Sequence, residues 1–481
     1  MVSIQEQVQF EAQKEVRWVS ISLSEVLERE MRFEASYFNV EGKTTRQLVQ
    51  NCPFEKLSLN AENGFAKVTY PGRFKRVFIE DGIPIFTSSQ ILELMPQAKK
   101  YVSSKTTTDF EPLYLREGQI VMTRSGSVGF CSYVGKTLSG LLFSDDLLRI
   151  ECYNQLDAGY VYAFLKSKIG QILVSTNNYG SVVTHLEPEH LVTLAIPNPP
   201  EKVKRSISEK IYKAFTLRDE ANELLVKADS LLSLALSTVP LKELKPKCYR
   251  PSDVLNFEVK ISDLNLRFEA VYHAPIINEI NAQIAKNRVE LTTIGDKRVS
   301  KKIILPGRFK RIYVDREFGV PFLGGKDITQ FDPPELDYLS LKGHGPRIAK
   351  ELTLCQNMLL ITCSGTIGNV LLVPKHLEGW TASQHIIRIV SADDFNVGYL
   401  YAFLASEYGY QLIKQNIYGS VVDEINDDQI ASIRVPLLKQ ETMNEIGNLV
   451  LKANDLRSEA WFLEKQAVQN VEDLIKNNQK G

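Results

Sequence analysis

The chain lacks the features that mark most secreted proteins and membrane proteins. Its six cysteines are scattered, without a C-x-x-C pair or zinc-like spacing, which predicts reduced thiols in a cytoplasmic protein. The first residues are polar and charged, and no run approaches 18 uninterrupted apolar residues, so we expect neither export nor a membrane span. Net charge is only −1 over 481 residues. A surface that attracts nucleic acid must therefore be local.

Enzyme signatures are also missing. Gly129 precedes a Gly-Lys-Thr sequence at 135–137, but the spacing is one residue too long for a P-loop. Two Pro-Pro-Glu sequences, at 199–201 and 333–335, resemble the tetrapeptide of amino-methyltransferases. In those enzymes an aromatic residue follows Pro-Pro and stacks on the flipped base, whereas glutamate stands there in both sequences. We therefore predict no catalytic residues, no metal site and no cofactor.

What the chain does have is a tandem duplication with an offset of 235 to 239 residues. Three pairs of segments carry it: PGRFKR at 71–76 and 306–311, SGSVG at 125–129 with SGTIG at 364–368, and 159–183 with 398–422, where 15 of 25 positions are identical. This period is far longer than that of a solenoid repeat, so each copy is predicted to be a domain with its own core. Two similar but diverged domains indicate one kind of task performed at two places.

A stretch with helical spacing follows each copy. Apolar residues step alternately by three and four from Ile207 to Ala235 and, in the same register, from Ile446 to Leu474. This spacing predicts a coiled-coil seam, and 29 residues at about 1.5 Å each give a rod of roughly 43 Å. The predicted pairing residues are Ala214, Leu217, Ala221, Leu224 and Ala228 in the first helix and Ala453, Leu456, Ala460, Leu463 and Ala467 in the second.

The alternating alanine and leucine layers favour an antiparallel pair, with the two globular copies at opposite ends of the rod. The alternative is two independent helices, each packed on its own domain. Within each copy, short β-rich runs separated by Gly and Pro precede a helix, expected at about 158–174 and 397–414. The expected strands include 76–79, 83–86, 119–123 and 147–150, with counterparts at 311–314, 320–323, 358–362 and 386–390. The predicted fold class is α+β, with two duplicated domains separated by long helices that form an antiparallel coiled coil.

The repeated PGRFKR segment carries three cations around one aromatic residue. In the second copy, the run from Lys297 to Arg311 holds seven bases and no acid. Such density favours neutralisation by a polyanion, because Arg side chains and backbone N–H groups at a turn suit phosphate oxygens. The alternative is a solvated hairpin whose phenylalanine points into the core. The candidate phosphate contacts are Arg73, Lys75, Arg76, Lys301, Lys302, Arg308, Lys310 and Arg311.

Two further repeated segments contain hydroxyl groups. The Ser-Gly-x-x-Gly segments follow apolar runs, and their glycines suit a tight turn, which by itself accounts for them. Their hydroxyls are nevertheless candidates for phosphate contacts, and the YGSVV segments add a Tyr and a Ser that either face a nucleic acid or pack at a helix end. The candidates are Arg124, Ser127, Tyr179, Ser181, Thr366, Tyr418 and Ser420.

Together, the duplicated domain, the sequence GQIVMTRSGSVG at 118–129, the Ile-Pro and Val-Pro exits at 196–197 and 435–436 and the long helices resemble the specificity subunit of type I restriction-modification systems. The resemblance covers nearly the whole chain. It implies a non-catalytic, cytoplasmic subunit whose two target recognition domains each read half of a split site in double-stranded DNA. It also implies that the helical rod sets the gap and docks adenine methyltransferase subunits, and through them a motor-endonuclease subunit.

The implied domains are a first target recognition domain (1–200), a first helical spacer (201–250), a second target recognition domain (251–438) and a second spacer (439–481). Two alternatives stay open. One is a two-headed protein-interaction scaffold that does not bind DNA, which the near-neutral charge favours. The other is a specificity factor of a related phage-defence methyltransferase system.

Overall fold

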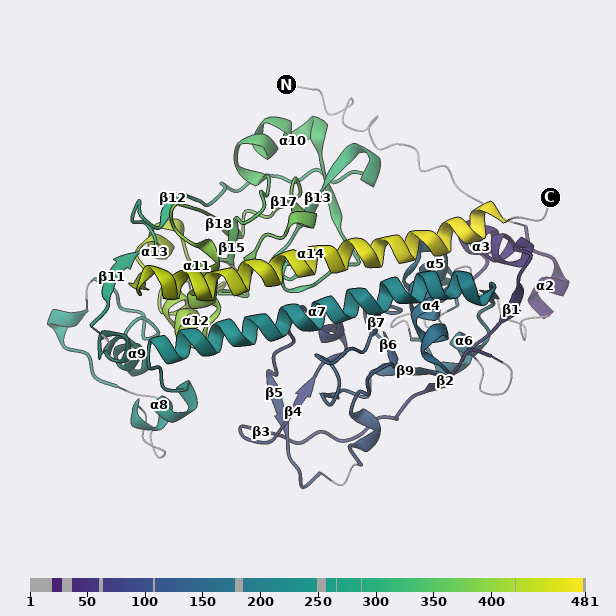
Figure 1. Cartoon of the computed structure of the whole chain (residues 1–481), viewed down its shortest axis with the longest axis horizontal. Coiled ribbons are helices and arrows are strands. Elements are labelled where there is room, and N and C mark those ends of the chain that lie inside the picture. The colour runs from purple at the N-terminus through teal and green to yellow at the C-terminus, as the bar shows by residue number, and fades with distance from the viewer. Residues whose placement is uncertain are drawn as a thin grey trace. The chain divides into compact units, whose positions relative to one another are not determined.

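The chain forms two compact units in the computed structural model (Figure 1). Unit 1 comprises Met1–Ile91, Gln97–Tyr212 and Glu464–Gly481, and unit 2 comprises Leu92–Pro96 and Lys213–Leu463. The structure describes residues 20–27, 37–59, 64–106, 109–177, 185–248, 257–264, 266–286, 288–419 and 421–478. Each unit therefore combines the strands of one sequence copy with parts of both long helices.

Unit 1 contains three small sheets. The strand orders are β2-β9-β6-β7, β3-β5-β4-β8 and β1-β10, all antiparallel except the parallel pair β4–β8. The strands are β1 (Glu55–Leu57), β2 (Ala66–Thr69), β3 (Phe78–Ile79), β4 (Ile83–Phe86), β5 (Lys100–Val102), β6 (Ile120–Thr123), β7 (Cys131–Tyr133), β8 (Leu142–Phe143), β9 (Leu147–Cys152) and β10 (Ile196–Asn198). The helices are α2 (Leu23–Leu27), α3 (Val40–Asn51), α4 (Gln155–Lys166), α5 (Lys168–Thr176) and α6 (Pro188–Val192).

Unit 2 repeats this topology. Its sheets have the orders β12-β18-β15-β16, β14-β13-β17 and β11-β19, with β13–β17 as the parallel pair. The strands are β11 (Glu290–Thr293), β12 (Ser300–Ile304), β13 (Gly319–Leu323), β14 (Asp337–Ser340), β15 (Leu359–Thr362), β16 (Val370–Leu372), β17 (Thr381–Ala382), β18 (Ile386–Ser391) and β19 (Arg434–Leu437). The helices are α8 (Leu241–Cys248), α9 (Pro275–Lys286), α10 (Leu341–Arg347), α11 (Val397–Ala405), α12 (Glu407–Lys414) and α13 (Asp427–Ala431). The predicted α+β fold class is confirmed.

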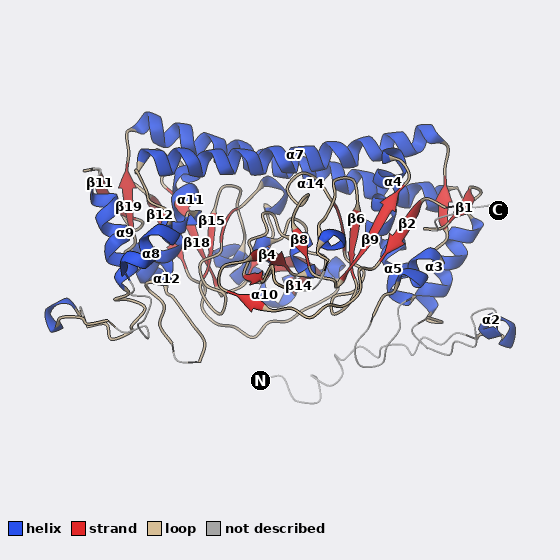
Figure 2. Ribbon diagram, turned by 90° about the horizontal axis from the view of Figure 1, so that it is seen from below, coloured by secondary structure: helices blue, strands red, loops and turns tan. Residues whose placement is uncertain are grey.

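The central strands are apolar on both faces because both faces are covered. All four residues of β6 and of β15 are buried, and α4 and α11 pack against the neighbouring strands β7 and β16 (Figure 2). Each central sheet also contains a buried arginine, Arg149 or Arg388, whose guanidinium donates to backbone carbonyls, for example to Ser383 O at 3.1 Å. Burial lowers the pKa of both arginines to about 10. Because Ser383 directly follows β17, Arg388 ties that strand's sheet to the sheet of β18.

Two sequence predictions are wrong in detail. Each expected single helix after the strands is two helices, broken at Ser167 or Ser406, where the backbone is extended and the serine Oγ accepts from the N–H of Gly170 or Gly409. The N-cap serine ends one helix and begins the next, which apolar periodicity alone does not reveal. The strand expected at 311–314 is reduced to one bridge between Tyr313 and Leu339.

The long helices are α7 (Glu201–Ala235) and α14 (Gln440–Asn477). Within unit 2 they lie side by side (Figure 1), and Ala214, Leu217 and Ala460 share a buried cluster with Leu456 and Leu463 at its edge. Ala221 and Ala453 are also buried, whereas Leu224 is only half-buried. Unit 1 holds the first part of α7 with the last part of α14, and unit 2 holds the remainder of both, so the pair is antiparallel, as the fold class predicts.

The buried stripe keeps the alternating steps of three and four but passes beside the predicted leucines. In α14 it runs through Ile446, Val450, Ala453, Arg457, Ala460, Glu464, Ala467, Val471 and Ile475. Leu456 and Leu463, which the sequence predicted for the seam, are only half-buried. Arg457 of this stripe donates to the Asn222 side chain at 2.9 Å. The Ala/Leu pattern did not predict this pair.

The globular part of each unit, here called its head, meets the following long helix through small residues, and a buried tyrosine binds the strand that leads into that helix. Tyr160 and Tyr399 donate to the carbonyls of Pro197 and Pro436, both at 2.6 Å. A Cβ on Gly159 would stand 2.8 Å from Ser208 Cα, and one on Gly398 would stand 2.2 Å from the carbonyl oxygen of Gly447. The glycines of the repeated GYxYAFL segments therefore permit backbone contact between head and helix.

Each unit also holds the end of the other copy's helix. In unit 1, Glu464 of α14 accepts from the Tyr162 hydroxyl at 2.8 Å, and Glu472 accepts from the N–H of Lys168 at 2.9 Å. In unit 2, the chain just after α7 is held by Tyr408, whose hydroxyl donates to Val239 O at 2.9 Å. Every long helix thus begins in one unit and ends in the other.

We predict that Gly398→Ala destabilises unit 2 by about 1 to 3 kcal/mol, because the added methyl group has no space against Gly447. Gly345→Ala is the matched control, since a Cβ there meets no atom within 4 Å. Chemical unfolding followed by circular dichroism measures both variants. Equal stability of the two would contradict the close helix–head contact.

Candidate nucleic-acid interface

In unit 1 the PGRFKR segment forms a loop between β2 and β3. Gly72 has a φ of +78°, which suits a turn. Phe74 packs against the cluster formed by Ile85 and its neighbours, and its ring meets that of Phe110 edge-on. Arg73, Lys75 and Arg76 are exposed. The aromatic ring therefore anchors the loop, as the structural alternative proposed, while the three cations face solvent.

The same loop in unit 2 lies between β12 and β13. Phe309 packs against the cluster of Phe322, Leu339, Ile348 and Leu352. Arg308 and Lys310 are exposed and Arg311 is half-buried. The Arg308 guanidinium pairs with the Glu424 carboxylate at 2.7 Å, and Arg311 lies over the Phe322 ring at 5.4 Å. Lys301 and Lys302, which precede this loop in β12, are both exposed, and Lys301 pairs with Asp393.

The Ser-Gly-x-x-Gly segments are tight turns after β6 and β15. Their glycines have positive φ values, from +73° at Gly365 to +94° at Gly368. A buried threonine closes each turn, since Thr123 and Thr362 accept from the N–H of the residue seven positions on, at 3.0 Å. Turn geometry therefore accounts for the glycines, and it leaves Ser127 and Thr366 exposed at the tips.

Arg124 differs from the other candidate cations because it is buried, with 6% of its surface exposed. Its guanidinium pairs with Glu187 and, at 3.7 Å, with Asp146, and it lies over the Tyr70 ring at 4.4 Å. Because two carboxylates neutralise this arginine, it positions the turn after β6 and does not offer its charge to a phosphate. Cys363 takes the corresponding place in unit 2.

The structure brings together segments that are far apart in the sequence. In unit 2, Glu424 pairs with Arg308 of the basic loop and bridges, through its backbone, to Ser364 of the turn and to Tyr418 of the YGSVV segment. Tyr418 is half-buried. In unit 1, Asp145 pairs with Arg76 of the loop, and the adjacent Asp146 accepts from Ser125 of the turn. Tyr179, Ser181 and Ser420 lie outside the described residues.

Sequence reasoning missed the carboxylates Asp145, Asp146, Glu187 and Glu424. Their loop positions have no periodic pattern. At the same offset, the other copy has Gln384, His385, Asn426 and His185 in place of these carboxylates, so each of them marks a charge difference between the copies. Exposed apolar residues follow both basic loops: Val77, Phe78 and Ile79 in unit 1, and Ile312 and Tyr313 in unit 2. Each basic loop thus continues into an exposed apolar ridge.

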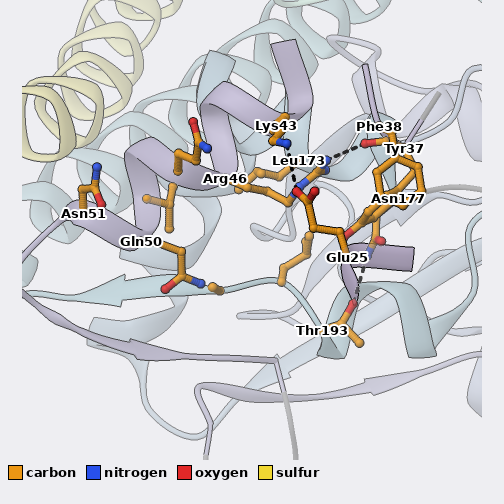
Figure 3. A pocket seen from close by; sticks show the side chains of 14 residues that line it. Glu25, Tyr37, Phe38, Lys43, Arg46, Gln50, Asn51, Leu173, Asn177 and Thr193 are labelled. Carbon is orange, nitrogen blue, oxygen red and sulfur yellow. Dashed lines mark hydrogen bonds and ion pairs between the residues drawn. The ribbon is translucent and has the colours of Figure 1, made fainter. Parts of the chain in front are cut away.

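A cavity of about 380 Å³ lies in unit 1 between α2, α3 and α5 (Figure 3). Glu25 and Lys43 form an ion pair of 2.9 Å across it, and Arg46 stacks on Tyr37 at 4.1 Å. The Ser22 backbone N–H and the Lys43 side chain lower the pKa of Glu25 to about 2. These contacts hold α2 against α3. Over the described ranges, no group of three or more His, Cys, Asp or Glu side chains could hold a metal ion.

Among the residues that the structure describes, no helix is long and apolar enough to cross a bilayer.

Comparison with known proteins gives a match for the second unit. No curated protein matches the chain. The solved type I restriction-modification system S subunit from M. genitalium is 12% identical over 90% of this chain and 97% of that chain, with a TM-score of 0.32. The HsdS subunit from Thermoanaerobacter tengcongensis is also 12% identical, over 90% and 96% of the two chains, with a TM-score of 0.26. Residues 320–449 match the model of the type I restriction modification DNA specificity domain.

Proposed function

We propose that the chain is the DNA-recognition subunit of a type I restriction-modification complex and has no catalytic activity of its own. One observation carries the proposal most directly: in unit 2 the basic loop, the Ser-Gly-x-x-Gly turn and Tyr418 converge on Glu424. Residues 320–449, the family match, span the turn and Tyr418. Unit 1 has the same strand order, except that its second sheet has one additional strand, β3. The same task is therefore proposed for both units, each with one half of a split site in double-stranded DNA.

Different parts of each surface serve different tasks. The PGRFKR cations are identical in both copies, so they suit the phosphate backbone, which has no sequence information of its own. The ridges that follow differ between copies, Val77-Phe78 against Ile312-Tyr313. Apolar and aromatic side chains contact thymine methyl groups and base edges in the major groove. We assign phosphate contacts to the loops, with Ser127 and Thr366 beside them, and base reading to the ridges.

The partners follow from the same role. The helices α7 and α14 each contribute residues to both units, and in the proposal they set the gap between half-sites and dock adenine methyltransferase subunits. A motor-endonuclease subunit joins through the methyltransferase. DNA methylation then requires the partner, and the chain alone with S-adenosylmethionine transfers no methyl group. Robust methylation by the chain alone would exclude the non-catalytic role.

Neutralising a basic loop should weaken DNA binding at every sequence. For Arg308→Gln, Lys310→Gln and Arg311→Gln together, we expect the log–log salt dependence of the affinity to flatten by up to about three counterions. The corresponding triple variant at Arg73, Lys75 and Arg76 should also flatten it. Fluorescence anisotropy with a labelled duplex over a range of KCl concentrations measures the slope.

The control for this experiment is the triple variant Lys202→Gln, Arg205→Gln and Lys213→Gln, which removes the same charge from α7. It should leave the slope near that of the unchanged chain. If both loop variants also kept the original slope, the loops would be structural. A chain whose binding to duplex DNA showed no salt dependence would instead favour the protein-scaffold alternative.

Lengthening both long helices should widen the gap without changing the bases read. One heptad inserted after Ala228 and one after Ala467 add about 10 Å at 1.5 Å per residue. B-DNA rises about 3.4 Å per base pair, so the gap should grow by roughly three base pairs, unless the accompanying rotation prevents both halves from binding at once. Methylome sequencing in a strain that supplies the partner subunits measures the site. Recovery of the original gap would contradict the role of the helices as a spacer.

A further inference from the structure

We propose that the two units contribute unequally to DNA binding. Unit 2 supplies most of the attraction to phosphate, whereas a pair of aspartates in unit 1 weakens the attraction of its basic loop to phosphate. This inference rests on the proposed DNA-binding function. It concerns the last two of the three residues that link β8 to β9 in unit 1 and β17 to β18 in unit 2. They are Asp145 and Asp146 in unit 1, here called the acidic dyad, and Gln384 and His385 in unit 2, called the neutral dyad.

The acidic dyad binds both cationic segments of unit 1. Asp145 is buried, with 4% of its surface exposed, and pairs with Arg76 of the basic loop. Asp146 lies 3.7 Å from the Arg124 guanidinium and accepts from the Ser125 hydroxyl. A buried carboxylate holds its partner more firmly than an exposed one, because water and salt screen the pair less. Arg76 is therefore less available to a phosphate than its exposure suggests.

Among the described residues, the equivalent arginine of unit 2 pairs with no carboxylate, because the neutral dyad stands in place of the aspartates. Arg311 occupies the position of Arg76, and among the described residues it contacts the Tyr313 hydroxyl at 3.4 Å and the Phe322 ring. Burial, and then the charges of Arg311 and Arg308, lower the pKa of His385, while Glu424 opposes the shift. His385 is thus uncharged at neutral pH. Glu424 pairs with this loop through Arg308, which is 78% exposed, and such an exposed pair exchanges readily for a phosphate.

The sequence that precedes each basic loop increases the difference in positive charge between the two units. The fifteen residues that end with PGRFKR contain seven bases and no acid in the second copy, at 297–311, but four bases and one acid in the first, at 62–76. In unit 2, Arg298 and Lys301 pair with Asp296 and Asp393, whereas Lys302 and Lys310 add exposed positive charge on either side of the turn. Counterion release grows with the number of phosphates neutralised, so the loop with more unpaired cations contributes more to affinity and to its salt dependence.

Reciprocal exchange of the dyads tests the inference in the full chain. The first variant is Asp145→Gln with Asp146→His, and the second is Gln384→Asp with His385→Asp. The probe is a labelled 30-base-pair duplex of arbitrary sequence, and anisotropy gives the affinity as a function of KCl. We expect the first variant to bind more tightly, with a slope steeper by about one, and the second to bind about threefold or more weakly, with a slope shallower by about one to two.

Two controls change the net charge equally on the long helices, Glu209→Gln with Glu223→Gln and Gln466→Glu with Gln469→Glu. Both should bind as the unchanged chain does. Where a dyad variant melts at a lower temperature, the isosteric Asp145→Asn and Gln384→Glu replace it. The loop variants give an independent measurement, since neutralising Arg308, Lys310 and Arg311 should reduce the slope more than neutralising Arg73, Lys75 and Arg76.

The possible outcomes distinguish a failure of this inference from a failure of the proposed DNA-binding function. Two results would contradict the unequal contribution but not DNA binding itself. One is salt-dependent binding that neither dyad variant changes relative to its control. The other is an equal loss of slope in the two loop variants. A chain that shows no salt-dependent binding to the duplex would overturn the proposed function itself.

Discussion

The rest of the structure depends on the contact of each head with its long helix, where no side chain separates the two backbones. A Cβ on Gly398 would come within 2.2 Å of the Gly447 carbonyl oxygen, and a Cβ on Gly159 would meet Ser208 at 2.8 Å. Interiors are packed so densely that such a contact admits little adjustment. The buried hydroxyls of Tyr160 and Tyr399 fix the same junction from the other side. Head and helix therefore move as one piece within each unit.

The two helices make the duplication interdependent. Glu464 and Glu472, near the end of the second helix, are bound by unit 1, and the end of the first helix is bound by Tyr408 in unit 2. Neither sequence copy is thus a complete folding unit by itself. The buried contact of Arg457 with Asn222 adds a polar pair to a seam of alanines. A buried polar pair of this kind is a known way to specify the register of paired helices.

Much of the fold could be predicted from the repeats, because residues retained at a constant offset imply equivalent elements. The central strands, the long helices and the exposed cations of PGRFKR follow from local sequence. The break at Ser167 could not be predicted, since a capping serine and a helical serine have the same neighbours in the sequence. The hydrogen-bond partners of Arg76, Arg124 and Arg308 could not be predicted either, because Asp145, Glu187 and Glu424 lie 63 or more residues away and the contacts exist only in the folded chain. The sequence alone thus identified the charged loop but not the carboxylates that pair with its arginines.

The central claim is that this chain decides where a partner enzyme methylates DNA, with one half-site for each unit. It is tested most directly by comparing the methylomes of a host strain with and without the chain while the partner subunits are kept. The account predicts adenine methylation at a single split site with a constant gap, present only with the chain. An unchanged methylome, or a chain-dependent site that is continuous rather than split, would contradict it.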